Sequence, residues 1–494
     1  MAAHANAANE SEDFDLFASF VFICRFASLL MKINPTLFRE YDIRGRIDRK
    51  DEFTDYAIDT ISRAFATYLG RRGIHDAVVA QDARPYSLRV KEIVVRALCE
   101  SGINVTEIDT VLVPIFYFSQ YALKKKGGVM VTASHNPWGW SGFKHAYDYS
   151  TTFVPEDMRE LREIVEKEDF MKGSGTHEAY PGIIEEYKKD VIGRVKLERH
   201  MTVLMDAGNG TAGAIVPDIL RAAGCTVIEQ YTTPSETRHH EANPSSAGML
   251  DAMREGVRTH PVDIGLGFDD DGDRLGAVDE EGGIIWPDRI LILLARAVLA
   301  KKPGGKIVFD VKSTDALTED IKAHGGVPVM WKTGHSYIKQ KAKEVDAVLA
   351  GERSGHIFFR DGYYGFDDAT FAALKLLEYV SRDPKPVSEI IAALPRYITS
   401  PVWHASCDDT KKYAVVERLT KQLTQEFGEE KVIDINGARV KFDDGWGLVR
   451  ASSNVPALVL VFEARTEEGL KYIEHFFRAQ LQQFPEVGQE WESG

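Results

Sequence analysis

One pattern of strand, turn, helix and strand occurs three times in roughly the first 390 residues and limits the fold more than any other feature. Each copy begins with a short run rich in β-branched residues, and these runs end at Asp82, Asp206 and Asp310. Apolar residues at helical spacing follow a polar turn. A glycine then stands where the helix should stop, at Gly102, Gly224 and Gly326. Parallel strands need such a crossover connection, so the repeat predicts three related α/β domains.

The segment from about residue 396 onward has a different pattern. Residues 438–464 alternate in hydrophobicity and predict an antiparallel hairpin or meander, and residues 467–484 have a helical period. A chain of 494 residues is too long for a single hydrophobic core. We therefore predict three α/β domains at 34–180, 181–283 and 284–395, followed by a smaller α+β domain at 396–494.

Residues 1–33 do not fit the domain pattern. Their apolar run is interrupted by Arg25 and is too short to span a bilayer, and acidic residues precede it where a secretory signal has basic ones. We expect a disordered or weakly docked extension, with a short packed helix as the alternative.

Cysteine use and net charge narrow the class of protein. The four cysteines are far apart in sequence, which argues against a zinc site or a disulfide framework and fits a reducing, cytoplasmic compartment. The net charge of −15 opposes binding to nucleic acid or to an anionic membrane. We expect neither partner, and an anionic ligand would need cations that gather locally.

Residues 267–280, GFDDDGDRLGAVDE, place four aspartates within five positions. In an extended loop Asp269, Asp271 and Asp273 can converge, and carboxylates so close repel one another unless a cation lies between them. Oxygen ligands of this kind suit Mg²⁺. An EF-hand is the rival interpretation, but its sixth position should be glycine and is Arg274. A solvated acidic turn is the remaining alternative.

Three other loops carry polar side chains between apolar runs. Residues 131–144, VTASHNPWGWSGFK, expose Ser134 beside His135, but they contain no GxSxG elbow. With a metal nearby, Ser134 could instead carry a phosphoryl group. Residues 350–359 offer groups that suit sugar hydroxyls, and residues 445–456 offer an arginine and hydroxyls that suit a phosphate. For each of the last two, an ordinary turn is an equal alternative.

Taken together, these motifs resemble those of the α-D-phosphohexomutase superfamily, and within it the bacterial phosphomannomutase/phosphoglucomutase branch. The resemblance extends from about Thr36 to Phe477. It rests on FREYDIRG (38–45), TASHNP (132–137) with GFK (142–144), DDDGDR (269–274), FDVKST (309–314), WKTGHS (331–336), GERSGH (351–356) and VRASSNVP (449–456). It implies a heart-shaped arrangement of four domains, with mixed sheets in the first three, and one loop of each domain facing a shared cleft.

The resemblance also implies roles for individual residues. Ser134 would be a phosphoserine that completes the coordination of Mg²⁺ by Asp269, Asp271 and Asp273. The other expected catalytic residues are His135, Lys144, Arg44, Arg274 and His356. Lys144, Arg44 and His356 are the candidates for proton transfer, and the sequence does not choose among them. The expected substrate-binding residues are Tyr41, Lys312, Lys332, His335, Glu352, Arg353, Ser354, Gly355, His356, Arg450, Ser452, Ser453 and Asn454.

The implied activity is the interconversion of hexose 1-phosphate and hexose 6-phosphate, with mannose and also glucose as the sugar, through a sugar 1,6-bisphosphate that also serves as activator. Phosphoglucosamine mutase and an inactive sugar-phosphate-binding relative are the alternatives. Two departures from the family pattern matter. Asp270 stands where the family has glycine, and either adds a carboxylate to the metal site or points away from it. Arg353 occupies a position that varies with sugar preference. The sequence leaves monomer and dimer open.

Overall fold

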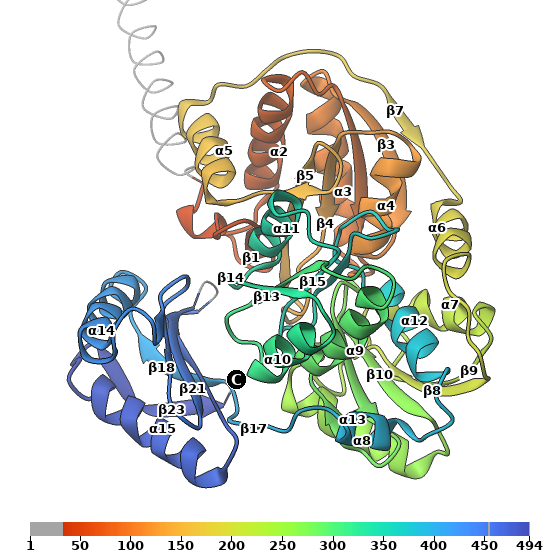
Figure 1. The fold of residues 1–494 in the computed structure, drawn as a ribbon. Coiled ribbons are helices and arrows are strands. Elements are labelled where there is room, and N and C mark those ends of the chain that lie inside the picture. Colours follow the sequence, from red (N-terminus) through yellow and green to blue (C-terminus); the bar gives the residue numbers. More distant parts are fainter. Residues whose placement is uncertain (1–32, 453–454, 494) are drawn as a thin grey trace, which may run out of the picture.

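The computed structural model describes residues 33–452 and 455–493. The predicted N-terminal extension, apart from Ile33, and the predicted substrate residues Ser453 and Asn454 lie outside the described residues. The described part of the chain forms four β-sheets that follow one another along the sequence (Figure 1). Within that part, no helix has both the length and the apolar composition needed to cross a membrane.

The first sheet has the strand order β1-β5-β4-β2-β3-β7, with β6 paired to β5. Its strands are β1 (Ile43–Arg46), β2 (Asp76–Gln81), β3 (Asn104–Thr110), β4 (Gly127–Val131), β5 (Trp140–Tyr147), β6 (Thr151–Thr152) and β7 (His177–Ala179). Its helices are α2 (Asp55–Gly70), α3 (Ser87–Glu100), α4 (Val113–Ala122) and α5 (Pro155–Lys167). Strand β2 is parallel to β3 and β4, whereas β5 is antiparallel to β4 and β1, so the sheet is mixed.

The second sheet has the order β12-β11-β10-β8-β9. Its strands are β8 (Met201–Asp206), β9 (Cys225–Gln230), β10 (Ile264–Phe268), β11 (Leu275–Asp279) and β12 (Ile284–Ile285), and its helices are α6 (Ile183–Ile192), α7 (Val216–Ala222) and α8 (Ala247–Thr259). Strands β8 and β9 are parallel, while β10 and β11 form an antiparallel hairpin. That hairpin holds the aspartate loop at its turn.

The third sheet has the order β14-β13-β15-β16. Its strands are β13 (Lys306–Asp310), β14 (Val327–Trp331), β15 (Leu349–Gly351) and β16 (Ile357–Phe359). Its helices are α9 (Pro287–Leu299), α10 (Asp315–Ala323), α11 (His335–Glu344), α12 (Ala369–Val380) and α13 (Val387–Ala392). Strand β13 is parallel to β14, so each of the three sequence repeats forms the predicted parallel pair with a connecting helix.

Glycines end the repeat helices much as the sequence indicates. Gly102 and Gly224 have φ of +89° and +99° after α3 and α7, a left-handed conformation that glycine adopts without steric cost. After α10, however, Gly325 has the positive φ of +73° rather than the expected Gly326. The addition of a Cβ at Gly326 would instead meet the side chain of Leu299, so that glycine allows close packing against α9.

The fourth sheet is antiparallel throughout its described pairings and has the order β19-β20-β21-β22-β18-β23, with β17 paired to β22. Its strands are β17 (Ile398–Thr399), β18 (Trp403–Cys407), β19 (Val432–Ile433), β20 (Ala438–Lys441), β21 (Gly445–Ala451), β22 (Ala457–Ala464) and β23 (Val487–Ser493). Helices α14 (Lys412–Phe427) and α15 (Glu467–Leu481) pack against it. The predicted α/β class, with a smaller C-terminal α+β domain, is confirmed.

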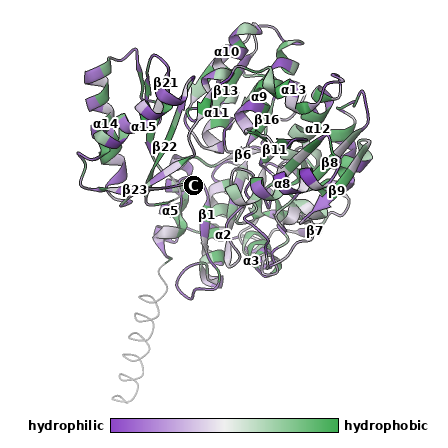
Figure 2. Ribbon diagram, turned by 90° about the horizontal axis from the view of Figure 1, so that it is seen from below, coloured by the Kyte–Doolittle hydropathy of each residue, from purple (hydrophilic) through white to green (hydrophobic). Residues whose placement is uncertain are grey.

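The hydrophobic core unites the first three domains but not the fourth. One continuous cluster contains residues of all three α/β sheets, such as Val78, Leu266 and Phe309. A second cluster lies within the first sheet and its helices, and the fourth domain has a core of its own around Val415, Phe462 and Phe477. In Figure 2 the outer helices carry both hydrophilic and hydrophobic residues, as expected for helices that cover a sheet with one face.

Candidate active site

The loop between β4 and β5 places Ser134 at the boundary between the first and second sheets. Ser134 is fully buried, and its φ of +50° is uncommon for a residue with a side chain. Its backbone N–H donates to Thr132 Oγ1 at 3.0 Å. Its hydroxyl lies 3.2 Å from Asp269 Oδ2 and 3.2 Å from His135 Nδ1. The serine oxygen of the first domain therefore touches the aspartate loop of the second.

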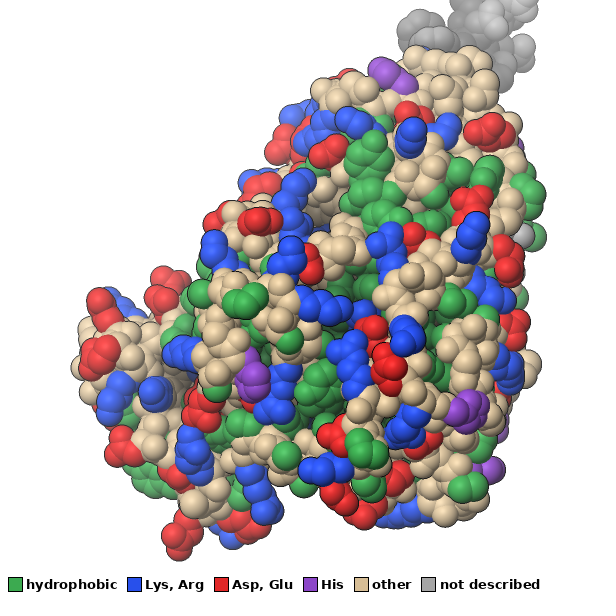
Figure 3. All heavy atoms as spheres, turned by 45° about the vertical axis from the view of Figure 1, so that its right-hand side comes forward, with side chains coloured by type: hydrophobic (Ala, Val, Ile, Leu, Met, Phe, Trp, Pro, Cys, Tyr) green, Lys and Arg blue, Asp and Glu red, His purple; other side chains and the backbone are tan. Residues whose placement is uncertain are grey.

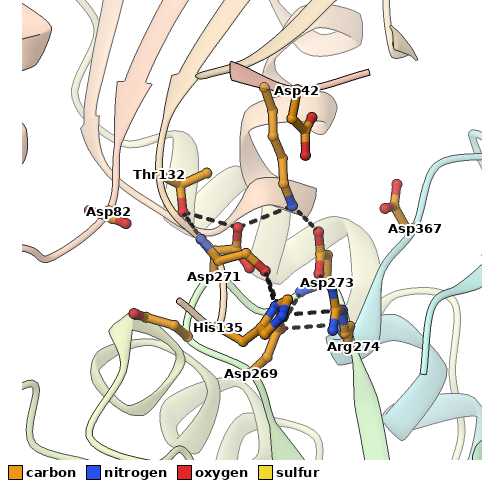
Figure 4. Close-up of polar contacts among 12 residues, drawn as sticks. Asp42, Asp82, Thr132, His135, Asp269, Asp271, Asp273, Arg274 and Asp367 are labelled. Carbon is orange, nitrogen blue, oxygen red and sulfur yellow. Dashed lines mark hydrogen bonds and ion pairs between the residues drawn. The ribbon is translucent and has the colours of Figure 1, made fainter. Parts of the chain in front are cut away.

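The aspartate loop turns between β10 and β11 and gathers three carboxylates (Figure 4). One oxygen of each of Asp269, Asp271 and Asp273 lies within 4.8 Å of the other two, and all three side chains are buried. Asp269 Oδ1 accepts hydrogen bonds of 3.1 Å from the N–H groups of Asp273 and Arg274, which closes the turn. Gly272, with φ of +71°, supplies the left-handed residue that this turn requires.

This cluster has the properties of a divalent-metal site. Among the described residues, Asp271 Oδ1 and Asp273 Oδ1 accept no hydrogen bond, although both are buried. Burial and the neighbouring carboxylates raise the pKa of Asp269 and of Asp271. Three carboxylates, two of which have an oxygen without a hydrogen bond, fit a hard cation, and Ser134 Oγ lies beside them. The protein therefore has a buried acidic site able to bind a metal.

Cations surround the same point. Lys144 on β5 forms ion pairs with Asp273 and, at 3.1 Å, with Asp271. Burial opposes its charge, but the two carboxylates outweigh burial and raise the pKa of Lys144. Burial likewise opposes ionisation of Asp273, yet Lys144 and His356 hold the pKa of Asp273 well below its ordinary value. Arg44 lies at the side of the site, 3.1 Å from Asp42 and 3.2 Å from Asn136 Oδ1.

Asp270 does not join the metal cluster. Its carboxylate forms ion pairs with Arg238 and, at 2.8 Å, with Arg84. Burial opposes its ionisation, and the two arginines overcome that effect and lower the pKa of Asp270. Of the two possibilities that the sequence left open, the structure therefore shows the side chain pointing away from the three clustered aspartates.

The hairpin of β15 and β16 brings the third domain to the site. His356 Nδ1 lies 2.9 Å from Glu352 Oε2 and 3.2 Å from Ser354 Oγ, and its Nε2 lies 3.5 Å from Asp273 Oδ1. Burial disfavours the imidazolium, but Asp273 and Glu352 together raise the pKa of His356 to about 9. Gly355, at φ +107°, lets the hairpin lie against the backbone of Leu275, which joins the second and third domains at this point.

His335 and Tyr41 continue this wall. Their rings meet edge to face with centroids 4.7 Å apart, and the rings of His335 and His356 are 5.4 Å apart. Burial and nearby Lys144 hold the pKa of His335 well below its ordinary value, so it is a neutral imidazole. The neighbouring histidines thus differ in charge, because only His356 contacts carboxylates directly.

A cavity of about 1310 Å³ opens above these groups and is lined by residues of all four domains. Most of the predicted site residues line it, namely Tyr41, Arg44, His135, Lys144, Arg274, Lys312, His335, Glu352, Arg353, Ser354, His356, Arg450 and Ser452. Lys332 is not among the described residues that line it, and its ammonium lies over the ring of Tyr337 instead. On the outer surface, the face in Figure 3 shows basic and acidic side chains interspersed.

Arg353 lines the cavity, but its guanidinium is already engaged. It lies 3.3 Å from Asp288 Oδ2 and over the ring of Trp286, and only 5% of the residue is exposed. Its backbone N–H donates to Asp310 at 3.1 Å. The positive charge of Arg353 is therefore largely balanced by Asp288, although the residue lines the cavity.

Three residues at the site were missed by sequence reasoning. Thr132 donates to Asp271 Oδ2 at 3.0 Å, Asp42 pairs with Arg44, and Arg84 donates to the carbonyl oxygen of Ser134 at 2.7 Å. Thr132 and Asp42 lie within the quoted motifs, so their position next to the expected residues was the available signal. For Arg84, the only nearby residue that could have indicated a role was Asp82, because its other partners are remote in sequence.

A second acidic group borders the metal cluster. Asp367, His356 and Asp273 each offer a ligand atom within 4.8 Å of the others. Lys339 lies 3.0 Å from Asp367, and Arg274 lies 3.3 Å from His356 Nε2. This group has only two carboxylates, and His356, whose pKa is raised to about 9, would have to lose its proton before it could bind a metal. The group of Asp269, Asp271 and Asp273 is therefore the better metal site.

Comparisons with known proteins agree with this geometry. Four family models match in order: phosphoglucomutase/phosphomannomutase alpha/beta/alpha domain I at residues 35–172, domain II at 183–283, domain III at 286–397 and the C-terminal domain at 405–480. The chain is 39% identical over 447 residues to a phosphomannomutase/phosphoglucomutase of Pseudomonas aeruginosa, covering 90% of this chain and 95% of that one.

Two further proteins are similar over most of their length. A phosphoglucomutase of Neisseria gonorrhoeae is 38% identical over 464 residues, with 93% of this chain and 99% of that one covered. A solved phosphoglucomutase/phosphomannomutase family structure from Burkholderia thailandensis has a TM-score of 0.84 and 33% identity, with 92% of this chain and 98% of that one covered. The family models together span more than half of the sequence, and the chain therefore belongs to the phosphoglucomutase/phosphomannomutase family.

Proposed function

We propose that this protein is a hexose-phosphate mutase, an isomerase that interconverts the 1-phosphate and 6-phosphate of mannose and of glucose, with Ser134 as the phosphoryl carrier. The observation that carries the proposal is the position of Ser134 Oγ, 3.2 Å from Asp269 within the buried triple-aspartate cluster. The family relationship and the names of the relatives from Pseudomonas and Neisseria support the same assignment.

The residues around Ser134 suit phosphoryl transfer, which depends on positioning and on charge neutralisation. Asp269, Asp271 and Asp273 would hold Mg²⁺, which would offset the charge of a phosphate on Ser134. Lys144 and Arg274 add positive charge on either side of the cluster. Arg44, near Asn136 of the same loop, extends this positive charge toward the cavity.

The third domain supplies groups that suit a sugar. Glu352 and Ser354 offer hydrogen-bonding oxygens at the cavity wall, beside His356. With a pKa raised to about 9, His356 is an imidazolium at neutral pH and can donate a proton or stabilise negative charge. The phosphate that is not being transferred would lie between Arg450, Ser452 and Lys312, which line the cavity from the fourth and third domains.

The size of the cavity is consistent with an intermediate that turns over between two transfers. Its volume of about 1310 Å³ exceeds the range of about 300–1,000 Å³ that is common for small-molecule sites. Phosphorylated Ser134 would give its phosphoryl group to the free hydroxyl of a hexose monophosphate, and the resulting 1,6-bisphosphate could turn over inside the cavity. It would then return its other phosphoryl group to Ser134 and leave the isomeric monophosphate as product. The same bisphosphate would activate protein whose Ser134 is unphosphorylated. We place the enzyme in the cytoplasm because its cysteines are scattered and hexose phosphates are intracellular metabolites.

A coupled assay with three substrates tests the proposal. Mannose 1-phosphate and glucose 1-phosphate should each yield the 6-phosphate in the presence of Mg²⁺ and a trace of glucose 1,6-bisphosphate. Faster turnover of glucosamine 1-phosphate would assign a phosphoglucosamine mutase instead. No turnover of any of the three, with protein shown to be folded and phosphorylated, would refute the mutase assignment.

A further inference from the structure

The side chain of Asp270 is buried inside the boundary between the first two domains. Only 2% of the residue is exposed. Its Oδ1 accepts from the N–H of Thr211 at 2.9 Å and from the hydroxyl of Thr211 at 3.2 Å. Its Oδ2 pairs with Arg238 of its own domain and, at 2.8 Å, with Arg84 of the first domain. Asp270 thus joins a turn of the second sheet to a turn of the first.

Arg84 connects this carboxylate to the serine loop. Its Nη2 donates to the carbonyl oxygen of Ser134 at 2.7 Å and to that of Asn136 at 2.8 Å. Its Nη1 pairs with Asp82, at the end of β2. Only 3% of Arg84 is exposed, so its position depends on these partners rather than on solvent. One guanidinium therefore fixes two peptide groups of the serine loop, the one that follows Ser134 and the one that follows Asn136.

A second bond closes a ring across the same boundary. The N–H of Ala83, next to Arg84, donates to Thr211 Oγ1 at 2.9 Å, and Thr211 itself donates to Asp270. The ring runs from Asp270 through Thr211, Ala83 and Arg84 back to Asp270. Two of its contacts, Ala83 to Thr211 and Arg84 to Asp270, cross between the domains, and the contact of Thr211 with Asp270 joins two turns of the second domain. The relative position of the turns that meet at this boundary is therefore set by polar contacts.

The serine loop needs such support because of its backbone conformation. Ser134 has φ of +50°, a left-handed conformation that residues with side chains adopt only where the surroundings hold them. The bond from Arg84 to its carbonyl oxygen and the bond from its N–H to Thr132 restrain the peptides on both sides. A buried arginine also requires balancing carboxylates, which Asp82 and Asp270 supply together.

We propose that Asp270 is a positioning residue that acts through Arg84 to hold Ser134 Oγ against the triple-aspartate cluster. The inference rests on the proposed role of Ser134 as the phosphoryl carrier. Asp270 touches neither the substrate nor the metal ligand atoms. It fixes the distance between a serine carried by one domain and carboxylates carried by another, and phosphoryl transfer depends on that distance.

The variant Asp270→Asn tests this role, with Glu280→Gln as the matched control. Asparagine keeps the size of the side chain and one acceptor for Thr211 but removes the negative charge that holds Arg84. Glu280 also bridges elements of different domains, through Ser388, but it contacts neither Arg84 nor the serine loop. We expect Asp270→Asn to lower kcat about 10- to 100-fold, because a small misplacement of reacting groups has effects of this size.

The expected signature separates positioning from general stability. KM should change by less than about 2-fold, since uniform substrate binding is untouched. The rate at which glucose 1,6-bisphosphate adds about 80 Da to Ser134, followed by intact-mass analysis, should fall in parallel with kcat. Glu280→Gln should leave both rates unchanged, even if it lowers the melting temperature.

A double variant makes the test stricter. If Asp270 acts through Arg84, then Arg84→Gln combined with Asp270→Asn should lower kcat no further than the more damaging single variant. Should Asp270→Asn fail to fold, Arg84→Lys replaces it, because an ammonium keeps the charge but cannot hold two carbonyls and two carboxylates at once.

Three results would overturn the inference: an unchanged phosphorylation rate in Asp270→Asn, effects that add fully in the double variant, or an equal loss of kcat in Glu280→Gln. Failure of the wild-type protein to acquire phosphate on Ser134 would instead refute the proposed function, and the inference with it. If the wild-type protein is active and acquires phosphate on Ser134, and Asp270→Asn has the same rates, the inference about Asp270 would be refuted while the proposed function would stand.

Discussion

Two regions of the site differ in how they are packed. Around Ser134 and Asp269, side chains of the first and second domains contact one another directly, whereas the residues of the fourth domain that line the cavity belong to a domain with a separate hydrophobic core. Thr132, Ser134 and Lys144 bond directly to aspartates of the second domain. The first three domains also share one hydrophobic cluster. The fourth domain packs around Phe462 and Phe477. It meets the third through a small apolar cluster around Val311 and Trp446 and through polar contacts such as that of Arg439 with Asp315.

The difference indicates a division of labour. Groups that transfer a phosphoryl group must be fixed relative to one another, and burial within a shared core provides that rigidity. Groups that grip the distant phosphate must admit a substrate and release it, which a separately packed domain permits. Figure 1 shows the fourth domain, in blue, set beside the other three and joined to them through the segment around β17. We expect it to close over the bound sugar.

The largest effect should come from Ser134→Ala, at the rigid end. Removal of the proposed carrier should lower turnover on the order of 10³-fold or more, because no other group takes over a missing nucleophile. The control is Ser141→Ala, a buried serine on β5 of the same domain, which should retain activity. A coupled assay with glucose 1-phosphate measures both. Appreciable turnover by Ser134→Ala would contradict the assignment of phosphoryl transfer to the region around Ser134.

Removal of the metal should affect turnover, which depends on the aspartate cluster, more than substrate affinity, which depends on Arg450 and Ser452. A chelator should lower turnover on the order of 10²-fold or more, since the carboxylates of Asp269, Asp271 and Asp273 then repel one another and the phosphate charge is not offset. Added Mg²⁺ should restore activity. Affinity for glucose 6-phosphate, measured by calorimetry, should fall much less, because Arg450 and Ser452 lie at the other end of the cavity. Equal losses of turnover and affinity would contradict the proposal that phosphoryl transfer and phosphate binding depend on different regions of the site.

The variant Arg450→Met tests the substrate-gripping end. Loss of a charged hydrogen bond to phosphate should raise KM about 10- to 100-fold and change kcat much less. Arg418→Met is a suitable control, because Arg418 lies on α14 of the same domain and pairs with Glu486 at the surface. Steady-state kinetics would decide. A fall in kcat without a rise in KM would place Arg450 at the transfer step instead.

The smallest expected effect is an acid sensitivity of the first domain. His145 is buried against Phe65, Phe143 and Phe153, and burial lowers the pKa of His145 to about 3. Because the unfolded chain takes up this proton first, the stabilising contribution is present above pH 6.5 and is lost as the pH falls toward 3. At about pH 5 the loss should be roughly 2 kcal/mol.

Hydrogen exchange in the first sheet measures this loss. The variant His145→Phe should flatten the pH dependence there, while His475→Gln, on the exposed face of α15, should not change it. Among the described residues of the fourth domain no histidine is fully buried; burial lowers the pKa of His404 too, but that side chain is only half-buried. Hydrogen exchange in the fourth domain should therefore respond less to acid. Equal acid sensitivity of the two cores would contradict this account of His145.

Local patterns were enough to predict much of the fold. The three repeats predicted the parallel pairs β2–β3, β8–β9 and β13–β14, because strand, turn and helix signals lie close together in sequence. The hairpin of β21 and β22 followed from alternation in the same way. The exact turn at Gly325 was missed, since two adjacent glycines give the same signal and packing against Leu299 decides between them.

The site was less accessible to sequence reasoning where its contacts are long-range. Motifs indicated Ser134 and the aspartates as residue types, but nothing local shows that Arg84 reaches the Ser134 carbonyl or that Asp270 turns toward Arg84. The contact of Lys332 was missed for a different reason: its ammonium lies over the ring of Tyr337, only five residues further on, and the motif did not indicate this contact. Partners 50 or more residues apart become visible only once the sheets are placed.

The most direct measurement of the central claim is the site of phosphorylation in protein incubated with glucose 1,6-bisphosphate, with and without Mg²⁺. Intact-mass and fragment analysis should show a gain of about 80 Da, located on Ser134, formed rapidly only with the metal and absent from Ser134→Ala. A phosphate on another residue, or none on Ser134 in a preparation that turns over hexose phosphates, would contradict the account.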